Sequence, residues 1–198
     1  MKKRDTITFR PLNKKTWKDW VELFGSRGAC GGCWCMYWRT NRKDFERNKG
    51  ERNRRAMRNL VSNGEQIGII AYKNEIPVGW CAVAPREKYI RLESSRVLKR
   101  FDDQHVWSVP CFFIAKEERR KGLSGEILKG IIAYCRKRKI KILEAYPVIP
   151  YSKNIPAPFA YTGILSAFLR EGFRISKKWS VARPIVRLDL QYFKYKSS

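Results

Sequence analysis

Three cations and two glycines stand close together in the middle of the chain. The segment reads Arg119-Arg120-Lys121-Gly122-Leu123-Ser124-Gly125. A helical pattern begins within it, so its backbone N–H groups stand at a helix start, where unpaired amides and the helix dipole favour an anion. Glycine lets the backbone approach an anion closely. The segment therefore predicts a phosphate-binding turn, with a solvated basic turn as the alternative.

The elements that would position this turn flank it on both sides. Residues 106–115 are apolar on both alternating faces, which is typical of a central strand covered on both sides. Pro110 lies inside this run and cannot donate to a ladder, so it indicates a bulge. After the turn, apolar residues recur at helical spacing from Leu123 to Cys135, which predicts a helix with one face packed on a sheet. The pattern is a bulged strand, a phosphate turn and a helix.

This combination resembles the GNAT superfamily of acyl-CoA-dependent N-acetyltransferases. The family pattern (Gln/Arg)-x-x-Gly-x-(Gly/Ala) reads here Arg119-x-x-Gly122-x-Ser124, with a mild departure at the last position. An upstream hairpin at 66–84, a later strand at 141–146 and a helix that ends in Gly172-Phe173 follow the family order. The resemblance implies an α/β (α+β) fold, with residues 1–198 as a single domain. Its mixed, mostly antiparallel sheet would contain a splayed, bulged strand and carry helices on both faces.

The resemblance also implies acetyl-CoA as the cosubstrate of an N-acetyltransferase. Residues 119–125 would bind its phosphates. The amides expected to hold the pantetheine arm and the acetyl carbonyl are those of Phe112, Phe113 and Ile114. Pro110 and Pro147 would splay the two central strands and open the slot that the pantetheine fills. The acetyl group would then pass directly to a primary amine on a small molecule or a protein.

Acetyl transfer from a thioester requires a proton for the departing thiolate. Family members often use a tyrosine in the helix that ends in Gly-Phe, but this chain has Phe168 at that position. Tyr161 is the first substitute, and Thr162 and Tyr146 are the alternatives. The missing tyrosine also keeps two other functions open: a CoA-binding sensor without catalysis, and a basic nucleic-acid-associated protein on the same fold.

The acceptor amine must be neutral when it attacks, so a base is also expected. Glu144 lies on the strand beside the predicted slot and is the first candidate, acting directly or through water. His105 and Asp103, just before the central strand, are the second choice. Cys111 lies on the central strand, but no histidine or cation adjoins it in sequence, so we expect it to stay a thiol rather than to carry an acetyl group.

A cysteine-rich segment near the N-terminus suggests either a metal site or an aromatic loop. Cys30, Cys33 and Cys35 have C-x2-C-x-C spacing. Zinc sites normally need four ligands, and the single histidine, His105, is distant in sequence, so we predict no metal. In the resembling family the corresponding loop lines the acceptor pocket. The candidates for acceptor contact are Trp34, Tyr37 and Trp38, with simple core packing as the alternative.

The charge of the chain is strongly positive, with 43 Lys and Arg against 18 Asp and Glu and a formal net charge of +25. These cations are spread along the sequence with no recognition-helix or zinc-finger pattern, which argues against specific nucleic-acid binding. No apolar run approaches the ~20 residues that span a bilayer. The charged N-terminus lacks an apolar signal segment, and six cysteines without such a segment are expected to stay reduced. The expected location is the cytoplasm.

Overall fold

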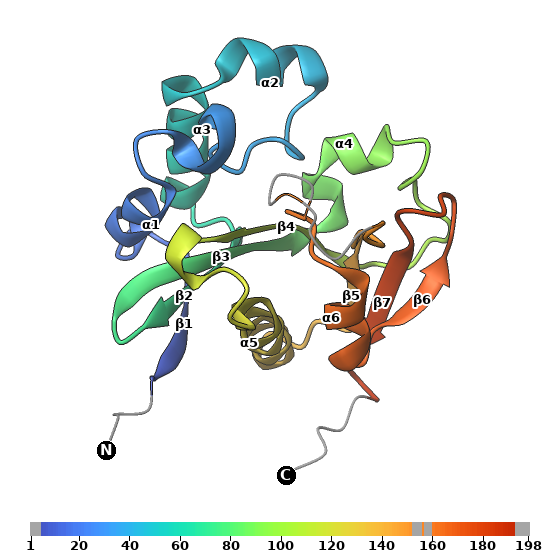
Figure 1. Cartoon of the computed structure of the whole chain (residues 1–198). Helices are drawn as coiled ribbons and strands as arrows, with labels where there is room; N and C mark the ends of the chain where they lie inside the picture. Colours follow the sequence, from blue (N-terminus) through green and yellow to red (C-terminus); the bar gives the residue numbers. More distant parts are fainter. Residues whose placement is uncertain (1–4, 152–155, 157–159, 193–198) are drawn as a thin grey trace.

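The computed structural model describes residues 5–151, 156 and 160–192, which form a seven-stranded mixed sheet with helices on both faces (Figure 1). The sheet order is β1-β2-β3-β4-β5-β7-β6, and every neighbouring pair is antiparallel except β4 with β5. The strands are β1 (Ile7–Pro11), β2 (Gly68–Lys73), β3 (Ile76–Pro85), β4 (Trp107–Ile114), β5 (Ile142–Ala145), β6 (Arg174–Lys177) and β7 (Ile185–Asp189). This architecture confirms the predicted fold class.

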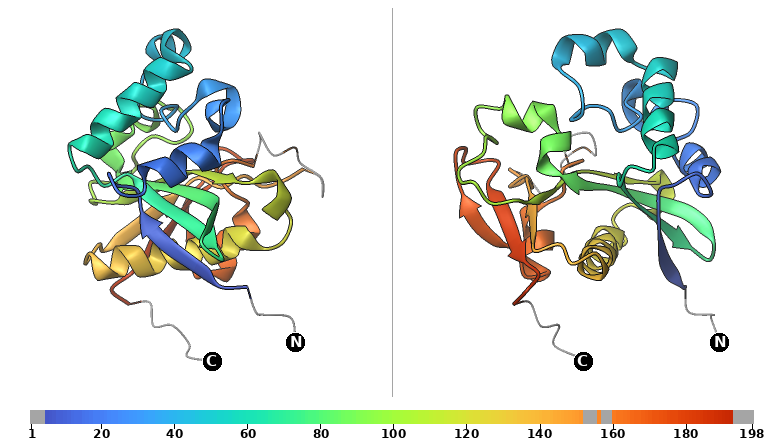
Figure 2. Two further views of the ribbon diagram at one scale, coloured as in Figure 1. Left: turned by 90° about the vertical axis from the view of Figure 1, so that its left-hand side faces the viewer. Right: turned by 180° about the vertical axis from the view of Figure 1, so that it is seen from behind.

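The helices divide between the two faces of the sheet. They are α1 (Trp17–Phe24), α2 (Arg42–Asn48), α3 (Glu51–Ser62), α4 (Ile90–Glu93), α5 (Leu123–Lys137) and α6 (Leu165–Arg170), with short turns at Gly28–Gly32, Arg86–Lys88 and Lys116–Glu118. Helices α1 to α4 lie on one side, and α5 and α6 lie on the other (Figures 1 and 2). One apolar core fills the space under α5 and α6, and a second fills the space under α1 and α3. None of the helices in the described residues is long and apolar enough to cross a membrane.

The ends of the helices follow the local sequence. The side chain of Asn41 accepts the N–H of Asp44 at 2.8 Å, which starts α2 as an N-cap. Asn13 is a residue type that favours an N-cap, but helix α1 begins four residues later, at Trp17. The Asn13 side chain instead accepts the N–H groups of Lys15 and Thr16. Such local side-chain bonds compete with the helix, so these residues form a turn that precedes it.

The split between β4 and β5 is the feature of the sheet that positions the site. In the pairing of β3 with β4, Ala82 faces Cys111 while Ala84 faces Ser108, so two steps on β3 match three on β4. This extra residue is the predicted bulge around Pro110. The parallel pairing of β4 with β5 covers three residue pairs and ends at Val109, directly before that proline. The prediction of a splayed central strand is confirmed.

Candidate functional site

The basic turn between β4 and α5 is exposed and open on its outer side. The Nε atom of Arg119 donates to the carbonyl of Ile114 at 2.9 Å, which ties the start of the turn to the end of β4. Arg120 and Gly122 both have left-handed backbone angles, with φ of 61° and 82°. A Cβ atom added to Gly122 would meet nothing within 4 Å. The turn thus presents the first amides of α5 to open space, as anion binding at a helix start requires.

The cations of this turn lie at the surface, and Lys121 lies 3.5 Å from Glu118. Arg119, Arg120 and Lys121 are exposed, whereas Leu123 is buried and anchors α5 in the first core. Ser124 and Gly125 are half-buried in the first turn of the helix. The Gly125 N–H donates to the Gly122 carbonyl at 2.9 Å, so the amides that precede it are the ones left for a ligand. The seven predicted phosphate-binding residues therefore form the turn and the first three residues of α5.

Past its pairing with β5, β4 runs beside a different segment of the chain. The N–H of Phe112 donates to the carbonyl of Tyr161 at 2.6 Å. The Phe112 ring packs edge-on against Phe168 at 5.9 Å, while Phe113 packs against Phe24 on the opposite face. A ligand that used the Phe112 amide would therefore have to take the place of the Tyr161 carbonyl.

Tyr161 lies half-buried at this junction. Its ring centroid is 6.1 Å from that of Tyr37 and 6.4 Å from that of Trp38, and the Arg183 guanidinium is 5.9 Å from its ring. Burial, with a smaller contribution from Tyr37, raises the pKa of Tyr161 to about 12. Its hydroxyl therefore stays protonated near neutral pH and can serve as a proton donor.

The three tryptophan and tyrosine candidates for acceptor contact do not lie together. Tyr37 and Trp38 pack edge-on against each other at 5.1 Å and border Tyr161. Trp34 instead lies in the second core, stacked on Phe24 at 5.9 Å. The structure thus gives Trp34 the core packing that was the alternative. Trp38 is also buried in an apolar cluster, but it and Tyr37 lie beside the candidate acid.

The cysteines of the N-terminal loop point in different directions. Cys30 is exposed, whereas Cys35 is buried and its sulfur accepts the indole N–H of Trp80 at 3.2 Å. Within the described ranges, no three His, Cys, Asp or Glu side chains are grouped to hold a metal ion. Interaction with Cys35, together with burial, holds the pKa of the Cys111 thiol well above its ordinary value. A raised pKa disfavours the thiolate that nucleophilic attack requires.

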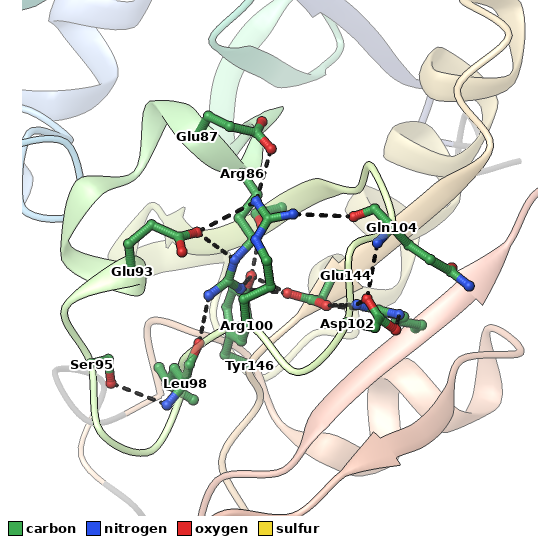
Figure 3. A network of polar contacts seen from close by, with 12 residues as sticks. Arg86, Glu87, Glu93, Ser95, Leu98, Arg100, Asp102, Gln104, Glu144 and Tyr146 are labelled. Carbon is green, nitrogen blue, oxygen red and sulfur yellow. Dashed lines mark hydrogen bonds and ion pairs between the residues drawn. The ribbon is translucent and has the colours of Figure 1, made fainter.

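The candidate base Glu144 lies inside a buried polar network, drawn in Figure 3. Its side chain is 1% exposed. One carboxylate oxygen accepts from Arg86 and from the Tyr146 hydroxyl, both at 2.6 Å, and the other accepts from the Nε atom of Arg187 at 2.8 Å. The Tyr146 hydroxyl also lies 2.7 Å from that of Ser108. Both oxygens of the candidate base are therefore engaged with donors.

The two arginines extend this network to other elements. Arg86, also 1% exposed, donates to Glu93 and to the carbonyl of Leu98, each at 2.7 Å. Arg187 pairs with Asp102, with one N–O distance of 2.9 Å. The network therefore joins the end of β3, the loop before β4, β5 and β7.

This setting defines what Glu144 can do. It pairs with Ser108 across the β4–β5 ladder, at the closed end of the split. A carboxylate between two guanidiniums is well placed to fix the geometry of the strands around it. The alternatives Asp103 and His105 are exposed on the loop before β4. Which of the three carries the proton stays a prediction.

Sequence reasoning missed the arginines that matter most inside the molecule. Arg86, Arg187 and the buried Arg39 are not distinguished by spacing in a chain that has 43 Lys and Arg. The one available indication was position, since Arg86 directly follows an apolar strand pattern and Arg187 lies within one.

The sequence model of the acetyltransferase (GNAT) family matches residues 34–157, which is more than half of the chain. The chain belongs to the GNAT family. The matched region includes β4, the basic turn, α5 and β5, the elements around which the site is built. A search of curated protein sequences finds no match.

Solved structures share the GNAT fold at low sequence identity. The PaiA N-acetyltransferase of Thermoplasma acidophilum, in complex with coenzyme A, is 13% identical over 93% of this chain and 99% of its own, with a TM-score of 0.50. YncA of Salmonella typhimurium, with acetyl-CoA, is 12% identical over 97% and 98%, with a TM-score of 0.51. A GNAT-family acetyltransferase of Streptococcus agalactiae is 13% identical over 92% and 95%, with a TM-score of 0.53.

Proposed function

We propose that this GNAT protein transfers an acetyl group directly from acetyl-CoA to a primary amine. The observation that carries the proposal is the exposed turn at residues 119–125, whose helix-start amides and three cations lie beside the splayed end of β4. Two structural neighbours, PaiA and YncA, hold coenzyme A or acetyl-CoA on the same fold. We propose further that residues 1–198 act as one domain in the cytoplasm, where its six free thiols would stay reduced.

The residues have separate tasks in this reaction. The turn at 119–125 binds phosphate groups, and the amides at 112–114 position the thioester and polarise its carbonyl. For the Phe112 amide, this requires the thioester to displace the Tyr161 carbonyl. The amine nitrogen forms a bond to the acetyl carbon as the carbon–sulfur bond breaks, and its electron pair goes to sulfur. Tyr161 donates its proton to that sulfur. Glu144 accepts the proton that the amine loses through a water, for which one of its bonds to Arg86, Tyr146 or Arg187 must open. Asp103 and His105 are the exposed alternatives.

Replacing Tyr161 with phenylalanine tests the acid. We expect kcat to fall by about 10²-fold, the usual contribution of a general acid, because the thiolate would leave without a proton. The melting temperature should change little, since the ring contacts with Tyr37 and Trp38 remain. The control is Tyr192→Phe, at a side chain that is 84% exposed. Equal kcat values for both variants would remove Tyr161 from the mechanism and leave the enzyme assignment standing.

Steady-state kinetics with both substrates varied tests whether the acetyl group passes directly from acetyl-CoA to the amine. Initial rates with acetyl-CoA and amine both varied should give intersecting double-reciprocal lines, because both substrates must be bound before the acetyl group moves. Cys111→Ala should keep most of the activity, since the pKa of that thiol is raised and no acetyl-cysteine forms. Parallel lines, or an acetylated Cys111 trapped by mass spectrometry without amine, would contradict direct transfer. Absence of CoA release with every amine tested, despite acetyl-CoA binding, would favour the sensor alternative.

A further inference from the structure

Arg39 is a buried guanidinium that forms no ion pair with any residue the structure describes. Its side chain belongs to a residue that is 9% exposed, and it lies over the Tyr89 ring at 4.8 Å. Within the part of the chain that the structure describes, neither its Nε nor its Nη2 atom has a hydrogen-bond partner. Arg86 provides the contrast, because its Nε and both terminal nitrogens all donate to protein oxygens.

The two vacant donors of Arg39 form a fork. Nε and Nη2 lie on the same edge of the planar guanidinium, and their N–H bonds run side by side. This edge matches the two oxygens of a carboxylate or a phosphate. A buried charge without a partner is costly, so a vacant and buried fork indicates a group that binds there.

Three other buried donors of the described residues are also vacant, and one of them belongs to Tyr89, over which Arg39 lies. Among the described residues, the Tyr89 hydroxyl, the Trp38 indole N–H and the Thr162 hydroxyl lack partners although all three groups are buried. Trp38 and Tyr89 belong to one apolar cluster, and Tyr161 packs against it. Thr162 directly follows Tyr161 in the chain, so the vacant donors belong to segments that border the candidate acid.

The charge around these donors is positive. Arg91 lies over the Tyr37 ring at 4.0 Å and has a buried, unpartnered Nη2 atom, and Arg183 lies near the Tyr161 ring. In the described ranges, none of the ion pairs that the structure forms includes Arg39, Arg91 or Arg183. Three guanidiniums without carboxylates around one aromatic cluster favour an anionic ligand over a polycation.

We propose that the acceptor is an amine that also carries an oxyanion, a carboxylate or a phosphate, and that the oxyanion binds the Nε–Nη2 fork of Arg39. This inference rests on the proposed function and names the substrate class of its site. The oxyanion anchors the acceptor, and the amino group at the other end reaches the acetyl carbon near Phe112 and Tyr161. Loss of the anion leaves buried donors unpaired, which is the condition under which a binding site discriminates strongly.

Matched pairs of acceptors test the class. Each L-amino acid is compared with its amide, and phosphoethanolamine with ethanolamine, by the release of CoA thiol. We expect the anionic member of at least one pair to have a kcat/KM at least about 10²-fold higher. The carboxylate and phosphate pairs identify which oxyanion is used. Neutral members that react as well as or better than anionic ones would overturn the proposal.

The Arg39→Gln variant separates ligand binding from structure. We expect KM for the anionic acceptor to rise about 10²-fold with KM for acetyl-CoA unchanged, and the melting temperature to stay equal or rise, because an unpaired buried charge is removed. Arg39→Lys should recover part of the affinity without the fork geometry. The control is Arg96→Gln, at an exposed arginine. A lower melting temperature with unchanged acceptor preference would show a structural role and refute the proposal.

A binding test keeps this inference separate from catalysis. Acetate and inorganic phosphate are titrated in a thermal-shift assay into a Gly122→Glu background, which removes the phosphate turn as a second anion site. The oxyanion should raise the melting temperature in this background and fail to do so when Arg39→Gln is added. No rise in either protein would overturn the oxyanion site even if acetyl-CoA binds the wild type. A rise in melting temperature that depends on Arg39, together with no amine turnover by the wild-type protein, would instead contradict the proposed function alone.

Discussion

Gly122→Glu is expected to abolish the rise in melting temperature that acetyl-CoA gives the wild-type protein. At a ligand concentration of 100 times Kd, binding contributes about 2.7 kcal/mol of stability, which corresponds to about 5–11 °C for a chain of this size. The substitution places a carboxylate in open space beside the first amides of α5, where a phosphate would lie. It also forces a side chain into a left-handed conformation with φ of 82°. Both effects act on the turn itself.

A second glycine separates these effects. Gly64 also has a left-handed conformation, with φ of 74°, and open space around its Cβ position, but it follows α3 far from the turn in sequence. Gly64→Glu should lower the melting temperature of the free protein by a similar amount and keep the full response to acetyl-CoA. A full response in Gly122→Glu would show that phosphate binds elsewhere. No response in the wild type at millimolar acetyl-CoA would contradict the proposed function.

Arg86→Met is expected to destabilise the protein by about 3–5 kcal/mol, because it leaves the buried carboxylate of Glu144 with one arginine and deprives the Leu98 carbonyl of its donor. The melting temperature should fall by about 6–20 °C. Chemical denaturation measures the free energy of unfolding directly. The double variant Arg86→Met with Glu144→Gln should recover part of the loss, since the unpaired charge is then gone.

Arg47→Met is the matched control for Arg86. Arg47 forms an ion pair with Asp44 within one helix and its side chain is 62% exposed. Exposed pairs of this kind contribute little, so its loss should cost less than about 1 kcal/mol. Equal effects of the two substitutions would mean that the network in Figure 3 adds nothing beyond an ordinary surface pair.

Much of the fold could be predicted because its signals are local. The apolar spacing of α5, the doubly apolar run of β4 and the proline that ends its pairing with β5 are all visible in short windows of sequence. The start of α1 could not be placed correctly, because side-chain bonds of Asn13 to nearby amides replaced the helix there. That competition depends on atomic geometry rather than on residue type.

The candidate site was predictable in part for the same reason. The phosphate turn is one continuous segment, so the sequence identifies all of it. Glu144 was singled out by its strand, but its partners Arg86 and Arg187 come from distant positions, and no local pattern shows that they surround it. Arg39 is a similar case, since its burial without a hydrogen-bond partner for Nε and Nη2 among the described residues is a property of the folded molecule.

The short ladder between β4 and β5 divides the sheet into two parts that are joined by few backbone pairs. One part contains β1 to β4, the other contains β5, β7 and β6, and three residue pairs join them. The bonds of Arg86 to Glu144 cross this joint at its closed end. A small rotation of the two parts about this joint would displace the far end of β4, beyond Val109, by more than it displaces the joint itself. The width of the gap beyond Val109 would thus depend on Arg86, which is not one of the proposed ligand contacts, and changes of packing around Arg86 would alter that width from a distance.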